Sequence, residues 1–451
     1  MTAAERTLDS LKSYPAYKDS GVEWIRDIPE SWEIRRLRDF ARLHSGNAFP
    51  DAYQGKTEGA VGFLKVGNLE NNGRMVITAA SHYVDLPTAA ELRARVFPKG
   101  VFVIAKIGAA LLKNRVRQLG IASCIDNNMM ALDVQLEDKA YFQHALSRLD
   151  FASTASGGAL PSLSANKVGQ LLLPIPPEPE RQVIAAFLDH ETARIDELVR
   201  EQEHLLEDIR QKRQATIDAA VTGQLLKPNS PRVSVTDIGD LPAHWEVVKL
   251  KRIAQVRGGV TKGRDLQGKH VIDVAYLRVA NVQDGYLNLE DVATIEIGAD
   301  ELERYSLKPG DVLMNEGGDN DKLGRGAVWR GQISPCVHQN HVFSVRPHGV
   351  DPDWLALINT SSYAKFYFFS NSKQSTNLAS ISSSNIKELP VVLPPGDECQ
   401  LILQEVRERL AQIDQLVLEV RANIEDMKLL RSTLITAATT GKIDVRDWSH
   451  A

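Results

Sequence analysis

The stretch PAHWEVVKL at residues 242–250 decides the fold, because residues 29–37 already read PESWEIRRL. A shift of 213 residues superimposes the Pro, Trp, Glu and Leu of the two stretches. Three more pairs of stretches match at similar shifts: FLKVGNL (63–69) with YLRVANV (276–282), SCIDNNMMALDV (123–134) with PCVHQNHVFSVR (335–346), and residues 179–199 with residues 397–417. An internal repeat fixes the architecture before local structure is considered. We therefore expect one unit written twice, from about residue 28 to the end.

Length and composition exclude several classes of protein. The 451 residues, 43% of them apolar, can bury two or three cores, since a domain usually has about 100–200 residues. Cys124, Cys336 and Cys399 are an odd number with no close pair, so neither a disulfide framework nor a CxxC zinc site is predicted. The start is charged and no run of about 18 apolar residues follows. We expect a cytoplasmic protein that does not span a membrane.

Each copy of the repeat has a mixed part and a helical part. Short β-branched runs such as GVFVIAKIG (100–108), VIDVAYLRV (271–279) and HVFSVRP (341–347) lie between Gly, Asn and Asp turn signals, which predicts an α+β globule. Prolines precede each helical part, and Gly223 and Gly441 follow them, as is typical of helix ends. The predicted segments are an N-terminal tail (1–20), a globule (21–177), a long helix (178–223), a linker (224–240), a second globule (241–395), a second long helix (396–441) and a tail (442–451).

The two long helices share an apolar seam with heptad spacing. Its members are Leu188, Ile195, Val199, Leu206 and Ile209 in the first helix, and Val406, Leu410, Ile413, Val417, Val420, Ile424 and Met427 in the second. An apolar stripe on a helix must be buried, and packing against the matching stripe of the other long helix would bury both. We expect two antiparallel helices in an intramolecular coiled coil that separates two similar globules with pseudo-two-fold symmetry. The alternative is that each helix folds back on its own globule.

Charge is unevenly distributed between the helices and the globules. Residues 178–223 contain six Lys or Arg against eleven Asp or Glu, and residues 397–441 contain five against eight. Because the whole chain has a net charge of −5, the remaining residues carry about +3. Mildly basic globules on acidic helices suit a polyanionic partner better than the overall charge suggests.

Loops rich in Gly, Asn and basic residues supply the candidate contacts to nucleic acid. Asn or Gln side chains suit the edge of adenine, and Arg or Lys that of guanine. The candidates are Lys106, Lys113, Asn114, Arg115, Asn127, Asn128, Lys262, Arg264, Lys322, Arg325, Gln339 and Asn340. The alternative is that basic residues form a solvated face and that Gly and Asn only turn the chain, which we favour for the glycine pairs at 157–158 and 317–318. Trp32 and Trp245 are expected in the core rather than stacked on bases.

No stretch predicts catalysis or a metal site. GRDLQGKH (263–270) resembles a phosphate-binding P-loop, but His270 stands where Ser or Thr is needed and a strand-like run follows. Glu137, Asp138 and Lys139 form a charged triplet that we interpret as surface. The sequence contains no HExxH motif and no G-x-S-x-G elbow. We expect a non-catalytic chain without a metal or cofactor of its own.

Several of these stretches together resemble the DNA-specificity subunit of Type I restriction-modification systems. They are YKDSGVEWIRDIPESWEIRRL (17–37), IGDLPAHWEVVKL (238–250), LPIPPEPERQVIAAFLD (173–189), VTGQL (221–225), TTGKI (439–443) and GDVLMNEGGDNDKLGRGAVW (310–329). The resemblance implies that each globule is a target recognition domain for half of a bipartite, asymmetric site in double-stranded DNA. It also implies that the helices set the spacing between the halves and dock two methyltransferase (M) subunits, which the restriction (R) subunits join. Gly46, Gly259, Gly318 and Arg325 match the family as scaffold residues.

The resemblance also assigns the cofactors to the partner subunits. S-adenosylmethionine, ATP and Mg²⁺ are expected there, and the methylated base would be an adenine flipped from the stack. Two other functions remain open. A coiled-coil scaffold with protein-binding globules would explain the helices, and a nucleotide hydrolase using Lys269 would explain the P-loop-like stretch. Salt-dependent affinity for duplex DNA would distinguish a DNA-binding chain from a protein-binding scaffold. An absence of nucleotide hydrolysis by the intact chain would exclude the hydrolase.

Overall fold

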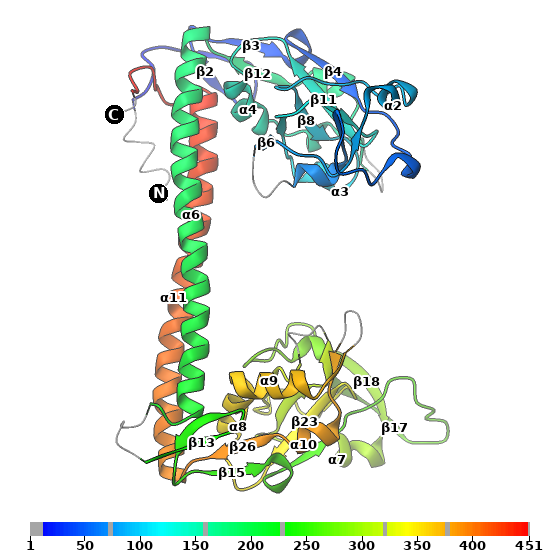
Figure 1. Cartoon of the computed structure of the whole chain (residues 1–451), viewed down its shortest axis with the longest axis vertical. Coiled ribbons are helices and arrows are strands. Elements are labelled where there is room, and N and C mark those ends of the chain that lie inside the picture. Colours follow the sequence, from blue (N-terminus) through cyan, green and yellow to red (C-terminus); the bar gives the residue numbers. More distant parts are fainter. Residues whose placement is uncertain are drawn as a thin grey trace. The chain divides into compact units, whose positions relative to one another are not determined.

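The computed structural model describes residues 12–70, 75–156, 161–225, 231–318, 323–374 and 379–449. It divides into two compact units, unit 1 with residues 1–203 and 421–451 and unit 2 with residues 204–420. Each unit contains one α+β globule and parts of both long helices (Figure 1). The predicted fold class, with two similar globules and two long helices, is confirmed.

The globule of unit 1 is built around two small sheets. The larger has the order β4 (Ala41–Ser45), β11 (Met129–Val134), β8 (Phe102–Ala105), β9 (Arg117–Leu119), β6 (Val76–Ile77). The smaller has the order β10 (Ser123–Ile125), β5 (Val61–Leu64), β7 (Tyr83–Val84). Strands β8 and β11 are largely buried. Continuous apolar runs of this kind are typical of strands covered on both faces.

Short helices and two strand pairs complete unit 1. The helices are α2 (Leu86–Glu91), α3 (Ala109–Leu112), α4 (Lys139–Ser147) and α5 (Ala165–Gly169). The strand pairs are β1 (Tyr17–Asp19) with β2 (Asp27–Pro29), and β3 (Glu33–Arg36) with β12 (Leu172–Ile175). Side chains from the larger sheet, from α4 and from both long helices share one core. The globule and the helix ends are therefore one packed body.

The globule of unit 2 repeats this plan. Its largest sheet has the order β16 (Ala254–Arg257), β23 (Val342–Pro347), β19 (Val312–Asn315), β21 (Gly326–Val328). A second sheet has the order β18 (Ala293–Gly298), β17 (Val271–Leu277), β22 (Cys336–His338). A third has the order β20 (Gly317–Gly318), β25 (Ala379–Ser380), β24 (Lys373–Gln374). The remaining pairs are β13 (Arg232–Val235) with β14 (Gly239–Pro242) and β15 (Glu246–Lys249) with β26 (Pro390–Leu393). The helices are α7 (Leu302–Tyr305), α8 (Pro352–Asn359), α9 (Ser362–Ser370) and α10 (Ser383–Lys387).

The strand pairings show that the duplication extends to topology. In unit 1 the only parallel pair of the smaller sheet joins β5 to β10, and in unit 2 the matching pair joins β17 to β22. Strand β3 pairs with the strand just before the first long helix, and β15 pairs with the strand just before the second. Each PxxWE motif therefore leads into a strand that closes its own globule.

The long helices are α6 (Glu178–Val221) and α11 (Gly396–Thr439), each of 44 residues. In each unit the parts of the two helices lie side by side (Figure 1). In unit 1, Leu188 and Ile195 share a core with Leu434 of α11. All twelve residues of the predicted seam are buried or half-buried. None of the helices in the described ranges combines the length and apolar composition of a membrane span.

The predicted linker and tails contain ordered elements, which corrects those boundaries. Strand β13 lies in the expected linker 224–240, and β1 lies in the expected tail 1–20. In the expected tail 442–451, Ile443 and Val445 are buried in the core of unit 1. These strands have only three or four residues with mostly exposed side chains. Backbone pairing rather than an apolar pattern defines these strands, so no periodic signal marks them in the sequence.

Candidate nucleic-acid interface

The repeated Trp–Glu motif places its tryptophan against the start of a long helix. Trp32 Nε1 donates to Glu180 Oε1 at 3.0 Å, and Trp245 Nε1 donates to Glu398 Oε2 at 2.8 Å. Glu180 and Glu398 lie in the first turns of α6 and α11, where the helix dipole stabilises a negative charge. Trp32 is fully buried and Trp245 is 7% exposed. Both are core anchors, as predicted.

The same tryptophans also contact the end of the other long helix. A Cβ added to Gly441, just after α11, would lie 2.2 Å from Pro29 Cδ and 3.4 Å from the Trp32 ring. A Cβ added to Gly223, just after α6, would lie 2.7 Å from Pro242 Cγ. Both glycines have positive φ, a conformation that L side chains disfavour. Each PxxW motif thus occupies the junction where one long helix begins and the other ends.

An ion pair joins the long helices at equivalent positions in each unit. In unit 1, Arg431 Nε lies 2.7 Å from Asp196 Oδ1, and in unit 2, Arg213 Nε lies 3.4 Å from Asp414 Oδ1. The arginines and the aspartates are both related by the shift of 218 that matches the two helices. In each unit the pairing fixes the helix register.

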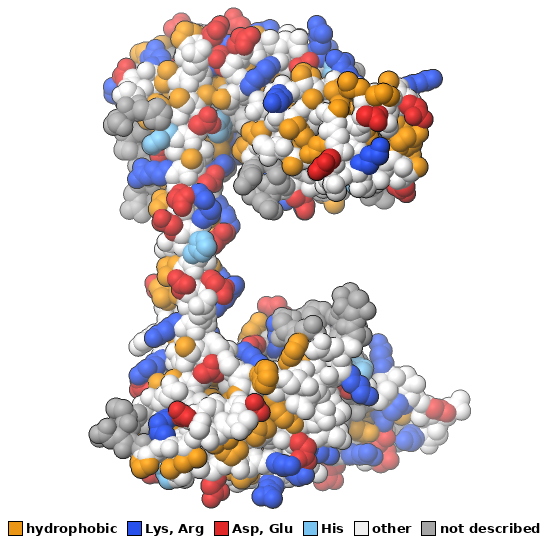
Figure 2. Space-filling model, viewed as in Figure 1, with side chains coloured by type: hydrophobic (Ala, Val, Ile, Leu, Met, Phe, Trp, Pro, Cys, Tyr) orange, Lys and Arg blue, Asp and Glu red, His pale blue; other side chains and the backbone are white. Residues whose placement is uncertain are grey.

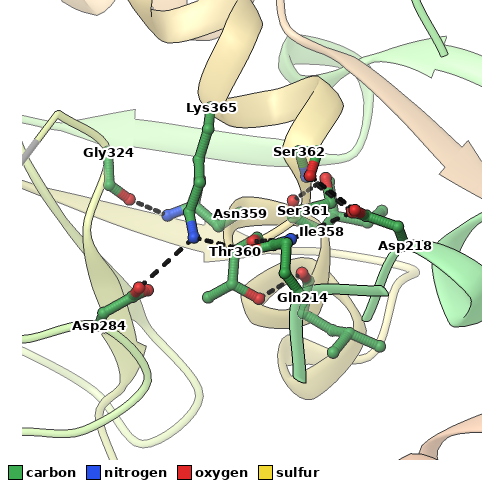
Figure 3. Close-up of polar contacts among 11 residues, drawn as sticks. Gln214, Asp218, Asp284, Gly324, Ile358, Asn359, Thr360, Ser361, Ser362 and Lys365 are labelled. Atoms are coloured by element: carbon green, nitrogen blue, oxygen red, sulfur yellow. Dashed lines mark hydrogen bonds and ion pairs between the residues drawn. The ribbon is translucent and has the colours of Figure 1, made fainter. Parts of the chain in front are cut away.

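In unit 2 a hydrogen-bond cluster attaches the globule to α6 (Figure 3). Asp218 Oδ1 accepts from the backbone N–H of Ser362 at 2.7 Å, and Asp218 Oδ2 accepts from its hydroxyl at 2.6 Å. Gln214 Nε2 donates to the Thr360 carbonyl at 3.1 Å, and Gln214 Oε1 accepts from Lys365 Nζ at 3.0 Å. These bonds join the start of α9 to α6.

In unit 1 several candidate contact residues have structural partners. Glu70 accepts from Arg115 at 2.9 Å and from Lys113 at 3.3 Å, and this pairing lowers the pKa of the Glu70 carboxyl. Asn114 adopts a φ of 48°, and its Nδ2 donates to the Leu149 carbonyl at 2.7 Å. Asn114 therefore turns the chain and holds the loop after α4, and its contact with a base stays a prediction.

Other candidates of unit 1 gather at the turn between β10 and β11. Asn127 is exposed at its tip. Asn128 donates from its backbone to Asp126 Oδ1 at 3.1 Å, and its carbonyl accepts from the Lys106 N–H at 2.7 Å. Gly46 fits under this turn, because a Cβ there would lie 2.0 Å from the Asp126 carbonyl oxygen. Lys106, Asn127 and Asn128 are thus brought together on one surface.

The equivalent turn of unit 2 joins β22 to β23 and contains Gln339 and Asn340. The Asn340 N–H donates to the Val260 carbonyl at 3.1 Å. Gly259 takes the place of Gly46, with a hypothetical Cβ 2.1 Å from the His338 carbonyl oxygen. Lys262 follows on an exposed loop. The glycines are scaffold because the backbones approach closely, and the turns above them differ between the units in side-chain chemistry.

A groove of about 640 Å³ with a largely apolar surface lies close to this turn in unit 2. Its lining includes Glu316, His341, Lys373 and Gln374. His341 Nδ1 lies 2.7 Å from Glu316 Oε2. Val279, which also lines the groove, donates its N–H to Gln339 Oε1 at 3.4 Å. The groove therefore offers hydrogen-bonding groups beside the predicted contacts.

Three further candidates of unit 2 are Arg264, Arg325 and Lys322. Arg264 pairs with Glu301 at 3.0 Å, and its guanidinium lies 5.5 Å from the Tyr305 ring centroid. Arg264 therefore has structural partners in the globule, and its contact with DNA stays a prediction. Arg325 is half-buried, and Lys322 lies outside the described residues. Figure 2 shows Lys and Arg interspersed with Asp and Glu on the visible faces of both globules rather than gathered in one patch.

The charged triplet 137–139 is not simply surface. The Asp138 side chain is 11% exposed and pairs with Arg181 of α6 at 3.2 Å, because α4 begins where the globule meets the long helix. Lys269, in the P-loop-like stretch, lies 3.6 Å from Glu301, and strand β17 rather than a helix follows it. Within the described part of the chain, no three His, Cys, Asp or Glu residues are grouped to hold a metal ion.

Sequence reasoning missed three residues that join the globules to the helices: Glu180, Glu398 and Asp218. Glu180 and Glu398 accept from the tryptophans, and the shift of 218 had already matched them. Asp218 has no acidic counterpart, because the same shift places Thr436 opposite it. The repeat therefore contained the signal for the first pair only.

Comparisons with known proteins find the same family in both halves of the chain. The model of the Type I restriction modification DNA specificity domain matches residues 29–207 and residues 242–425. The MjaVIII specificity subunit of Methanocaldococcus jannaschii is 23% identical over 433 residues, which cover 93% of this chain and 95% of that protein. The putative MjaX specificity subunit of the same organism is 26% identical over 42% of this chain. The EcoKI specificity subunit of Escherichia coli K12 is 23% identical over 67% of it.

The aligned parts span 44% of the MjaX protein and 64% of the EcoKI protein. Among solved structures, a chain from a study of complex assembly and conformational transition of the type I R-M system has a TM-score of 0.65 at 16% identity, covering 91% of this chain and 98% of that chain. The HsdS subunit from Thermoanaerobacter tengcongensis has a TM-score of 0.50 at 18% identity, covering 92% and 98%. These two likenesses show the fold. Since the family model matches most of the sequence, the chain belongs to the family of Type I restriction-modification DNA-specificity subunits.

Proposed function

We propose that the chain reads a bipartite, asymmetric sequence in duplex DNA, one half-site with each globule. The observation that carries this proposal is the duplication of the scaffold down to single contacts, combined with different side chains on the equivalent turns. The Trp–Glu bond and the helix ion pair recur in both units. The turns contain Asn127 and Asn128 in one unit and Gln339 and Asn340 in the other.

Amide side chains on these turns have the chemistry that reads base edges. Asn and Gln can make two hydrogen bonds to adenine in the major groove, and each such pair discriminates by about 1–3 kcal/mol. Because the two turns differ, each globule favours a different half-site. Lys106 and Lys262 lie near the two turns and can contact phosphates, which position a protein on DNA without reading sequence.

The long helices then act as the spacer and as the docking surface for partner subunits. Six leucines outside the seam are exposed on the described long helices: Leu198, Leu205, Leu401, Leu416, Leu418 and Leu429. Exposed apolar side chains on a helix suit a protein partner. In this proposal two methyltransferase subunits dock there and the restriction subunits join them, and these partners supply S-adenosylmethionine, ATP and Mg²⁺. This chain contributes no catalytic group, and the adenine is flipped out by the partner.

Binding to duplex DNA at several salt concentrations tests the proposal against a protein-binding scaffold. If the chain reads DNA, the logarithm of its affinity falls linearly with the logarithm of the salt concentration, with a slope of about −0.9 for each phosphate contacted. Two matched variants, Asn127→Ala and Gln339→Ala, then test the assignment of half-sites. The readout is the sequence motif at which the assembled complex methylates adenine. Each variant should relax the specificity of one half-site and leave the other half-site unchanged. A salt-independent interaction, or equal effects of both variants on both half-sites, would contradict the proposal.

A further inference from the structure

Unit 1 contains a basic cavity that the proposed function does not use. Its volume is about 620 Å³, and it lies where the globule meets α6 and α11. The lining includes five arginines and one carboxylate: Arg115, Arg117, Arg148, Arg200, Arg431 and Asp196. These residues come from β9 and the loop before it, the end of α4, and both long helices. Only the folded chain brings them together.

The acidic groups nearby do not neutralise this cluster. Asp196 pairs with Arg431, Glu70 pairs with Arg115, and Glu197 pairs with Arg200. Among the residues that the structure describes, no carboxylate lies within ion-pair distance of Arg117 or Arg148. Two positive charges are therefore left without a counterion in the cavity.

Both guanidinium groups that have no counterion also lack a hydrogen-bond acceptor at Nε, while Arg117 Nη1 donates to the Val116 carbonyl at 2.9 Å. The Nε atoms of Arg117 and Arg148 are buried without a partner among the described groups. Burial and the charges of Arg115 and Arg431 lower the pKa of Arg117, and burial and Arg431 lower that of Arg148. Arg117 and Arg148 are half-buried, and a partly buried cation without a counterion costs free energy. An anion in the cavity would supply both the missing acceptors and the missing charge.

The equivalent junction of unit 2 shows that the scaffold does not require this cluster. There β21 pairs with β19 as β9 pairs with β8, and its residues are Gly326, Ala327 and Val328. The contact with α6 is closed by the hydrogen bonds of Gln214, Asp218 and Ser362 (Figure 3). The arginine cavity is therefore a property of unit 1 alone among the described junctions.

We propose that the cavity of unit 1 binds a phosphate group through the guanidinium groups of Arg117, Arg148 and Arg431. The planar fork of arginine donates two parallel hydrogen bonds to phosphate oxygens. The cavity is large enough for a phosphate together with the group that bears it. Two sources present the same chemistry: a backbone phosphate of bound DNA, and a free anion such as inorganic phosphate or pyrophosphate.

Thermal unfolding of the full chain tests for the free anion. Inorganic phosphate and pyrophosphate are titrated against chloride at matched ionic strength. The wild-type chain is expected to gain a saturable increase in Tm. Arg148→Gln and Arg117→Gln should abolish that increase, Arg148→Lys should weaken it because it keeps the charge without the fork, and the exposed control Lys18→Gln should retain it. An equal increase in all of these variants would overturn a specific site.

The salt dependence of binding to a short random-sequence duplex tests for the DNA source. Loss of one phosphate contact in Arg148→Gln should reduce the slope of log affinity against log salt by about 0.9, while Lys18→Gln leaves it unchanged. A change in slope without an effect of free phosphate on Tm identifies DNA, and the reverse identifies a free anion. No effect of the variants in either assay overturns the proposal. Failure of the wild-type chain to bind DNA would refute the proposed function instead, and the phosphate titration would still decide the cavity.

Discussion

Deleting one heptad from each long helix should shorten the spacer between the two half-sites without changing their bases. The ion pairs Asp196–Arg431 and Arg213–Asp414 are separated by 16 residues on each helix, 197–212 on α6 and 415–430 on α11. Removing residues 201–207 together with 420–426 leaves the same number of residues between the two ion pairs on each helix and preserves the heptad spacing of the seam. At about 1.5 Å per residue, each helix becomes shorter by about 10.5 Å.

The deletion shortens the two long helices but hardly rotates one end of each helix relative to the other end. Seven residues are almost two helical turns, so the deletion rotates the helix face by only about 20°. Base pairs are about 3.4 Å apart, so the shortening corresponds to at most about three base pairs if the helices run along the DNA. We expect the methylated motif to keep both half-sites and to lose about one to three base pairs of spacer.

The assay is sequencing of adenine methylation in cells that express the variant with its partner subunits. A control that replaces the two heptads with seven residues of the same seam pattern should leave the spacer unchanged. Deleting residues 201–207 alone should abolish methylation, because the helices can no longer pair in register. An unchanged spacer, or altered half-site bases, would refute the assignment of spacing to the helices and of reading to the globules.

Other predictions concern the scaffold. Trp245→Ala should lower the free energy of unfolding by about 3–5 kcal/mol in urea titrations, because it empties a buried site and removes the bond to Glu398; a loss below about 1 kcal/mol would show that the junction is not an anchor. Gly259→Ala should cost at least about 1–3 kcal/mol by overpacking against a backbone carbonyl, whereas Gly67→Ala, which has no atom within 4 Å of the added Cβ, should have little effect in the same titration. Burial lowers the pKa of His338 to about 4, below its value of about 6.5 in unfolded chains. The unfolded state then binds more protons between these values, so stability is full above about pH 6.5 and falls by up to about 3 kcal/mol toward pH 4. His338→Asn should flatten this dependence in urea titrations at pH 7 and pH 5, and an unchanged dependence would locate the titrating group elsewhere.

The repeat and the helices could be predicted from the sequence because their signals are periodic. A Pro-x-x-Trp-Glu motif recurs in register with an apolar seam of heptad spacing, and both patterns depend on residue type alone. The hairpin β13–β14 could not be predicted, since its first strand is mostly exposed and its partner is selected by backbone hydrogen bonds. Weak local patterning hides short strands of this kind.

The candidate contacts were harder to predict because residue type does not reveal a side chain's partner. Asn114 has the amide of a base reader, but its left-handed backbone and its bond to the Leu149 carbonyl make it a turn residue. Arg264 is neutralised by Glu301, which lies 37 residues away in the sequence. The arginine cavity joins Arg117 to Arg431 across most of the chain. Such long-range pairings are created by the fold.

The central claim is that this chain selects a bipartite DNA sequence for its partner subunits. The most direct measurement is the pattern of adenine methylation, by single-molecule sequencing, in cells that express the methyltransferase subunits with and without this chain. We expect one asymmetric, two-part motif to be methylated only when the chain is present. An identical pattern in both cells, with the methyltransferase subunits shown to be active, would contradict the claim.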